Sequence, residues 1–202
     1  MNLPNKITIA RICMIPVFVL IFFLDGVLPF AHGIAAILFA VAAFTDFIDG
    51  YIARSRGLVT NLGKFLDPIA DKVLVSTAML LVLTLQESIF AHLGEWVYIA
   101  LAVSICLIMA RELIISAFRQ IAAANGVIMA ADKLGKVKTI FQDIALFAIF
   151  FFAGIVSLYE TWMQWHTYLM AFALVLFAVA TILTVWSGIA YIINNKQVLK
   201  DA

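Results

Sequence analysis

Six long apolar segments alternate with short polar connections in this sequence, and no other feature constrains its fold as strongly. The segments lie at about residues 7–24, 31–53, 66–86, 95–119, 137–157 and 167–193. A helix needs about 20 residues to cross the hydrocarbon core of a bilayer, and each segment is close to that length. Gly, Pro, Asn and charged residues between the segments indicate turns. We therefore expect an all-α integral membrane protein with six transmembrane helices.

Composition supports a membrane location. The chain has 202 residues, of which 65% are hydrophobic and 12% charged, whereas about a quarter of the residues of a soluble domain are charged. In water, a chain of this composition would expose large apolar patches. Because the connections are too short to hold a second folded unit, residues 1–202 are expected to form a single membrane domain.

Basic residues are distributed unevenly along the chain. All thirteen are expected at one end of the six helices: Lys6, Arg11, Arg54, Arg56, Lys64, Lys72, Arg111, Arg119, Lys133, Lys136, Lys138, Lys196 and Lys200. The connections at the opposite end contain only Asp25, Glu87, Glu95 and Glu160 as charged residues. Because cytoplasmic loops of membrane proteins carry the excess of Lys and Arg, both termini are predicted to be cytoplasmic.

Four aspartates lie close together in the stretch FTDFIDGYIARSRGLVTNLGKFLDPIADK. Asp46 and Asp49 are three positions apart, and Asp67 and Asp71 are four positions apart. Each pair therefore projects from one face of its own helix. Because a short turn joins the two helices, the four carboxylates could meet at one point on the cytoplasmic side.

Four carboxylates near hydrocarbon need a compensating positive charge. Oxygen ligands favour hard divalent cations, and a pair of such ions can clamp a phosphoryl group during its displacement. Two alternatives remain open from the residues alone. One is a structural network with nearby Arg and Lys residues, in which Asp67 caps a helix that has Pro68 at its first position. The other is a pathway for protons or cations through a carboxylate-lined ion carrier.

The sequence around the aspartates resembles the signature of the CDP-alcohol phosphotransferases, Dx2DGx2ARx8Gx3Dx3D. The matching residues are Asp46, Asp49, Gly50, Ala53, Arg54, Gly63, Asp67 and Asp71. The resemblance extends to the six-span plan and so covers nearly the whole chain. It implies transfer of a phosphatidyl group from CDP-diacylglycerol to a small alcohol, no nucleic-acid partner, and a homodimer among membrane lipids. It also implies a location in a bacterial inner membrane, with the active site on the cytoplasmic side.

The resemblance further implies roles for individual residues. Two divalent metal ions, Mg²⁺ or Mn²⁺, would be bridged by Asp46 and Asp67, with Asp49 completing one site and Asp71 completing the other. Asp71 would also be the catalytic base. The expected contacts to CDP-diacylglycerol are Asn5, Thr8, Gly50, Ala53, Arg54, Thr60 and Gly63.

The remaining cytoplasmic cations are candidates for binding the acceptor alcohol. Arg111 and Arg119 lie near the end of the fourth segment, and Lys136 and Lys138 lie where the fifth begins. Together with Lys64 they could form a basic pocket suited to an acceptor that carries phosphate. The alternative is that they are positive-inside anchors or attract anionic lipid headgroups.

Four stretches indicate which alcohol is used: NLPNKITIARI, GLVTNLGKFLDPIADK, ARELIISAFR and KLGKVKT. They resemble bacterial members of the family that transfer to glycerol 3-phosphate, which gives phosphatidylglycerol phosphate and CMP. Members that use inositol phosphate, serine or phosphatidylglycerol remain alternatives, because a basic pocket would also suit inositol phosphate.

Overall fold

The computed structural model describes residues 2–55, 60–85, 93–124, 133–158 and 163–195. Across these ranges the chain forms six helices and no strand, which confirms the predicted all-α class. The helices are α1 (Leu3–Phe22), α2 (Ala31–Ser55), α3 (Asn61–Leu83), α4 (Glu95–Ala124), α5 (Lys133–Leu158) and α6 (Met163–Asn194).

The helices extend beyond the apolar segments that predicted them. α3 begins at Asn61 rather than near residue 66, and α4 continues to Ala124 rather than ending near residue 119. Apolar residues mark only the part of a helix that lies in hydrocarbon. The polar turns at the helix ends still form backbone hydrogen bonds, so hydropathy alone underestimates the helix length.

Five of the six helices contain a stretch long and apolar enough to cross a membrane, among the residues that the structure describes. The helix without such a stretch is α3, because Asp67, Asp71 and Lys72 interrupt its first half. Its remaining part is apolar, and Leu74, Met79 and Val82 are buried in the core. The charges of the candidate site therefore replace the apolar residues that a simple membrane span would have.

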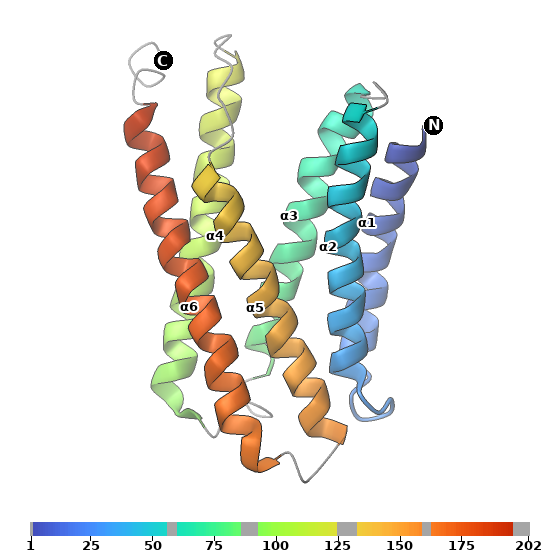
Figure 1. Ribbon diagram of the computed structural model, residues 1–202, viewed down its shortest axis with the longest axis vertical. Coiled ribbons are helices and arrows are strands. Elements are labelled where there is room, and N and C mark those ends of the chain that lie inside the picture. The colour runs from blue at the N-terminus through green and yellow to red at the C-terminus, as the bar shows by residue number, and fades with distance from the viewer. Residues whose placement is uncertain (1, 56–59, 86–92, 125–132, 159–162, 196–202) are drawn as a thin grey trace.

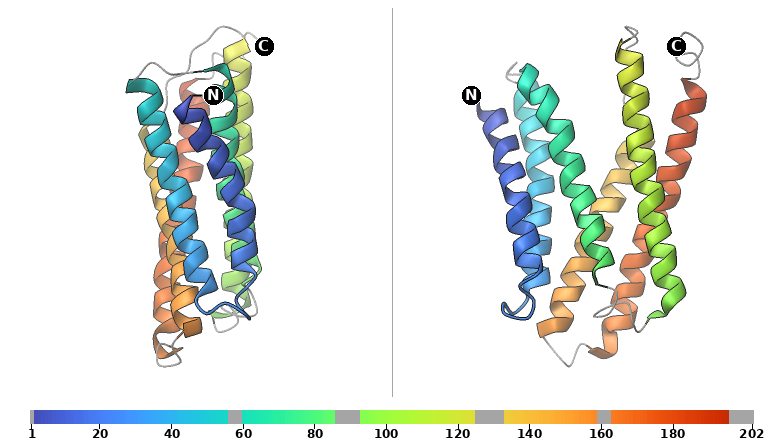
Figure 2. Two further views of the ribbon diagram at one scale, coloured as in Figure 1. Left: turned by 90° about the vertical axis from the view of Figure 1, so that its right-hand side faces the viewer. Right: turned by 180° about the vertical axis from the view of Figure 1, so that it is seen from behind.

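The helices form two groups that lie side by side (Figures 1 and 2). α1, α2 and α3 pack against one another, while α4 and α5 each pack against α6. α5 leans across to contact α2, and α3 contacts both α4 and α5. Figure 1 shows the two groups diverging toward the end of the bundle where α1 begins and α6 ends. The start of α1 and the end of α6 are thus at the same end, as an even number of helices crossing in alternate directions requires.

Aromatic rings join α5 to the first group. Phe150 of α5 packs edge-to-face against Phe18 and Phe22 of α1 and Phe39 of α2, with ring centroids 5.4 to 6.4 Å apart. Nearer the opposite end from the termini, the backbones of α2 and α5 touch, because a Cβ added at Gly154 would lie 2.3 Å from the Gly33 amide nitrogen. Only glycine at position 154 permits this close approach.

Thr60 caps the start of α3. Its Oγ1 accepts a hydrogen bond from the Gly63 amide at 3.0 Å, as expected for an N-cap threonine. The alternative that Asp67 caps this helix is therefore wrong, since Asp67 and Pro68 lie inside α3. Asp67 is instead about two turns further in, where its side chain contacts α1 through Thr8.

Candidate active site

Arg11 of α1 holds two of the four aspartates. Its guanidinium donates to Asp46 Oδ1 at 2.5 Å and also pairs with Asp49 Oδ2. Arg11 is only 1% exposed, although it lies in the apolar part of α1. A buried arginine is stable only where anions compensate its charge. α1 therefore supplies a fixed cation to the carboxylates of α2.

Asp67 and Asp71 face the same region from α3. Asp67 Oδ1 accepts a hydrogen bond from the Thr8 hydroxyl at 2.7 Å. Electrostatic interactions link Asp49 to Asp46 and Asp67, and link Asp71 to Asp46. The four aspartates thus lie within electrostatic range of one another where α1, α2 and α3 meet.

The start of α1 is tied to the start of α3 by further predicted site residues. Thr60 Oγ1 donates to Asn5 Oδ1 at 2.9 Å. A Cβ added at Gly63 would lie 2.9 Å from Asn5 Oδ1 and 3.2 Å from Thr60 Oγ1, so a side chain here would disturb both. Asn5, Thr8, Thr60 and Gly63 therefore form one cluster beside Asp67.

Other predicted contacts to the donor follow Asp49 along α2. Gly50 is half-buried in α2. The backbones of Ala53 and Arg54 continue this helix, and that of Lys64 belongs to α3, but the three side chains lie outside the described part of the structure. Their predicted roles stay predictions.

The chemistry of the four aspartates fits a hard divalent cation, because all the donor atoms are carboxylate oxygens. In the described residues, however, no three His, Cys, Asp or Glu side chains are grouped as a ready-made metal site. Arg11 pairs with Asp46 and Asp49, so its guanidinium supplies at these two carboxylates the positive charge that a metal ion would otherwise supply. A metal ion that uses them must compete with Arg11.

A cavity of about 550 Å³ lies between α3 and α4. Its polar lining includes Asp71 and Lys72 of α3 and Arg111, Glu112 and Arg119 of α4. The proposed base and two of the proposed acceptor-binding cations thus line one cavity. Lys72 also donates a hydrogen bond to Ser116 Oγ of α4, which joins the two walls.

Residues of α6 position the two arginines. Arg111 Nη2 donates to Ser187 Oγ at 3.2 Å, and Arg119 Nε donates to Tyr191 Oη at 3.1 Å. The Arg119 guanidinium also lies 5.2 Å from the centre of the Tyr191 ring, within range of a cation–π interaction. A Cβ added at Gly188 would lie 2.9 Å from Arg111 Cγ, so glycine here makes room for the arginine stem.

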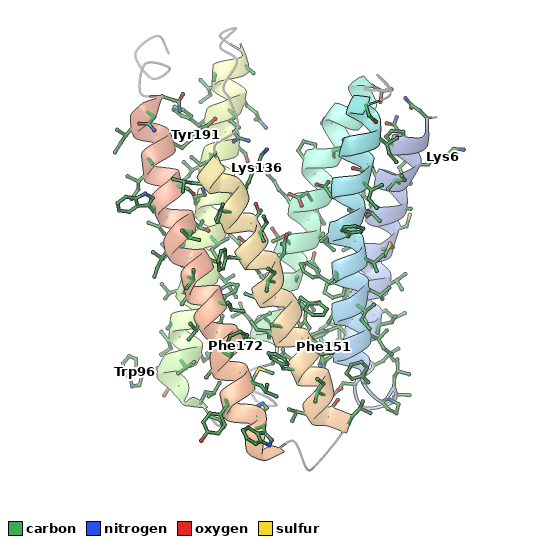
Figure 3. The ribbon with its side chains drawn as sticks, viewed as in Figure 1. Lys6, Trp96, Lys136, Phe151, Phe172 and Tyr191 are labelled. Carbon is green, nitrogen blue, oxygen red and sulfur yellow. The ribbon has the colours of Figure 1, made fainter. Side chains whose placement is uncertain are left out.

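Lys138 and Lys136 of α5 differ in their surroundings. Lys138 is 2% exposed and pairs with Glu112, whose Oε1 also accepts from Arg111 Nη1 at 3.4 Å. Lys138 lines a second, smaller cavity. Asp71, Lys72 and Glu112 line both this cavity and the larger one. Lys136 is exposed and, in the described structure, lines neither cavity. Figure 3 shows Lys136 and Tyr191 toward the same end of the bundle as Lys6, and Trp96 at the opposite end.

Sequence reasoning missed several of these residues. Arg11 was counted only as a positive-inside charge, although a charge inside an apolar span usually marks a functional site. Lys72 was counted only among the basic residues, and Glu112 belongs to no motif that marks it. Ser187 and Tyr191 carry no recognisable motif, and only the packing of α6 against α4 reveals their role.

The sequence matches that of a known enzyme family. The family model described as CDP-alcohol phosphatidyltransferase matches residues 1–194. The chain therefore belongs to the CDP-alcohol phosphatidyltransferase family, as its signature predicted, and it is a transferase.

Curated relatives narrow the class. A Bacillus subtilis protein is 37% identical over 211 residues, covering 100% of this chain and 98% of its own length. Proteins of Escherichia coli K12 and Shigella flexneri are each 39% identical over 205 residues, covering 99% of this chain and 98% of their own lengths. All three are named CDP-diacylglycerol–glycerol-3-phosphate 3-phosphatidyltransferase.

Proposed function

We propose that this enzyme transfers the phosphatidyl group of CDP-diacylglycerol to glycerol 3-phosphate, which gives phosphatidylglycerol phosphate and CMP. The observation that carries the proposal is the cavity shared by Asp71, Arg111 and Arg119. A base and phosphate-binding cations in one cavity suit an acceptor with a hydroxyl at one end and a phosphate at the other. The names of the full-length relatives support the same choice of acceptor.

On the acceptor side, Arg111 and Arg119 bind the phosphate of glycerol 3-phosphate through charge-assisted hydrogen bonds. Lys138 adds positive charge from α5, and Lys64 and Lys136 draw the anion toward the cavity from its cytoplasmic side. Ser187 and Tyr191 fix the directions of the two arginines. This division gives the cations held by other side chains the role of binding and the remaining ones the role of attraction.

On the donor side, CDP-diacylglycerol enters from the inner leaflet with its acyl chains in lipid. Asn5, Thr8, Gly50, Ala53, Arg54, Thr60 and Gly63 surround its cytidine diphosphate. The family uses divalent metal ions, and Asp46, Asp49, Asp67 and Asp71 are the residues that would hold two Mg²⁺ or Mn²⁺ ions. Such ions would neutralise charge on the diphosphate.

The reaction is a displacement at phosphorus. The acceptor oxygen forms a bond to the phosphorus that carries diacylglycerol, and the bond from that phosphorus to the CMP oxygen breaks. Asp71 takes the proton of the attacking hydroxyl as general base. Asp71 is suited to this role because it is the one of the four aspartates that lines both cavities.

Purified protein tests the acceptor directly. With CDP-diacylglycerol and Mg²⁺, release of CMP should depend on glycerol 3-phosphate and be far slower with inositol phosphate, serine or phosphatidylglycerol. Faster release with one of these would assign the enzyme to that acceptor instead. An ion carrier would move ions across sealed vesicles without releasing CMP. Release of CMP therefore distinguishes a transferase from an ion carrier.

The proposal also requires an orientation, with both termini and the site facing the cytoplasm of a bacterial inner membrane. Single cysteines at Ser55 and Glu95, both exposed at opposite ends of the bundle, test it in a chain lacking Cys13 and Cys106. An impermeant thiol reagent should label position 95 but not position 55 in intact cells. The reverse pattern would contradict the orientation. Native mass spectrometry of the detergent-solubilised protein tests the homodimer that the family resemblance implies.

A further inference from the structure

Gln142 of α5 is a buried polar residue to which the proposed reaction gives no role. Its side chain is 1% exposed, and its Oε1 has no hydrogen-bond partner in the described structure. An amide oxygen buried without a donor is costly, and most such atoms in proteins are bonded to protein, water or ligand. The position of Gln142 therefore calls for a donor from outside the protein.

The oxygen belongs to a residue that lines the smaller cavity. This cavity has a volume of about 20 Å³ and is also lined by Asp71, Lys72, Glu112 and Lys138. A volume of about this size accommodates one water-sized group. Because Asp71, Lys72 and Glu112 line the larger cavity as well, the smaller one adjoins the acceptor cavity beside the proposed base.

The chemistry of the cavity selects the kind of group that enters it. Lys138 pairs with Glu112 and Lys72 donates to Ser116, and neither ammonium donates to Gln142 Oε1 in the described structure. The oxygen of Gln142 needs an N–H or O–H donor and cannot bind a fully ionised phosphate, which only accepts. A single hydroxyl meets both the size and the donor requirement.

We propose that Gln142 recognises the secondary hydroxyl of a vicinal diol phosphate acceptor while the neighbouring primary hydroxyl attacks from beside Asp71. This inference rests on the proposed function. Glycerol 3-phosphate has its secondary hydroxyl on the carbon next to the attacking CH₂OH group, so both hydroxyls reach adjacent positions. Gln142 is thus a specificity residue that favours acceptors with two neighbouring hydroxyls.

The test compares two acceptors and one substitution. 3-Hydroxypropyl phosphate has the phosphate and the primary hydroxyl but lacks the secondary one. Gln142→Met keeps the length of the side chain and removes the accepting oxygen. We expect kcat/KM for glycerol 3-phosphate to fall about tenfold to a hundredfold, while kcat/KM for the analogue changes less than about threefold, because its contact was never made.

Equal losses for the two acceptors would show that Gln142 has a packing role. No loss for either acceptor would show that Gln142 does not contact the acceptor. Either result would overturn the inference. Gln142→Glu keeps an accepting oxygen and should retain the wild-type preference for glycerol 3-phosphate, which keeps the test decisive if the Met variant does not fold. Thr181→Val is the matched control, since it removes a buried hydroxyl of α6 that bonds the Phe177 carbonyl of its own helix. If the wild-type protein does not use glycerol 3-phosphate at all, the proposed function is wrong. If the wild-type protein uses it and Gln142→Met does not change the preference, only the role of Gln142 is wrong.

Discussion

The two sides of the candidate site are arranged with opposite charges. On the carboxylate side, one cation, Arg11, holds Asp46 and Asp49. On the cation side, one carboxylate, Glu112, holds Arg111 and Lys138. In each region one side chain, the minority charge, pairs with two side chains of the opposite charge.

The two minority charges differ in their access to solvent. The side chain of Arg11 is 0% exposed, whereas that of Glu112 is 28% exposed and lines both cavities. Glu112 can therefore turn toward solvent more readily than Arg11 can. We expect the carboxylate side to keep its arrangement when the acceptor binds, and the cation side to exchange Glu112 for the acceptor phosphate.

The largest effect is expected at Asp71, which borders both sides. Asp71→Asn keeps the size of the side chain but cannot accept a proton, so turnover at saturating substrates should fall about 10²-fold to 10⁴-fold. CMP release measures turnover, and thermal unfolding in detergent checks that the variant folds. Near-normal turnover would remove Asp71 from the role of base.

The next largest effect is expected at Arg11. Arg11→Met leaves Asp46 and Asp49 without their cation, and breaking a buried pair typically costs about 3–5 kcal/mol of stability. Thermal unfolding should therefore occur at a lower temperature, and Mg²⁺ should restore more stability to this variant than to wild type. Lys6→Met is the matched control, because Lys6 is exposed on the same helix. Equal Mg²⁺ effects in wild type and Arg11→Met would show that Arg11 and metal do not compete.

A smaller effect is expected when a cation of the acceptor cavity is lost. Arg119→Gln or Lys138→Gln removes a charge proposed to bind the acceptor phosphate, and such a contact is worth about 1.5–3 kcal/mol. KM for glycerol 3-phosphate should rise about tenfold to a hundredfold, provided that KM follows binding. KM for CDP-diacylglycerol should change little. Equal rises in both constants would mean that these residues act as anchors or structural partners.

The smallest effect is expected at Tyr191. Tyr191→Phe keeps the ring beneath Arg119 and removes only the hydroxyl that accepts from its Nε. One neutral-acceptor hydrogen bond contributes about 0.5–1.5 kcal/mol, so KM for glycerol 3-phosphate should rise about twofold to tenfold with kcat unchanged. Tyr168→Phe, at an exposed position of the same helix, is the control. A fall in kcat without a rise in KM would contradict a role in positioning Arg119.

Some of this arrangement follows from sequence and some does not. The six helices follow from the apolar segments, and the placing of each aspartate pair on one face of its own helix follows from local spacing, because residues three or four apart share a helix face. The support of Arg111 by Ser187 and of Arg119 by Tyr191 joins residues more than seventy positions apart. Such contacts depend on how α4 and α6 cross, and a single sequence contains no pattern that fixes that crossing.

Arg11 illustrates a different limit of sequence reasoning. Counting basic residues assigned it correctly to one end of the bundle but not to a burial state. Whether a charge within an apolar helix reaches water or turns inward depends on its neighbours, here Asp46 and Asp49 of another helix. The count therefore predicted topology and overlooked a residue that holds the site together.

The glycine contact between α2 and α5 has a mechanical consequence. Gly33 and Gly154 bring the two backbones together near the end away from the termini. The two helices can pivot about this contact. Asp49 lies about 24 Å further along α2 at 1.5 Å per residue, so a change of about 5° in tilt would move it by about 2 Å. Helix tilt responds to the thickness of the bilayer. A change in bilayer thickness that altered the tilt of α2 against α5 would therefore change the distance between the donor and acceptor sides of the site.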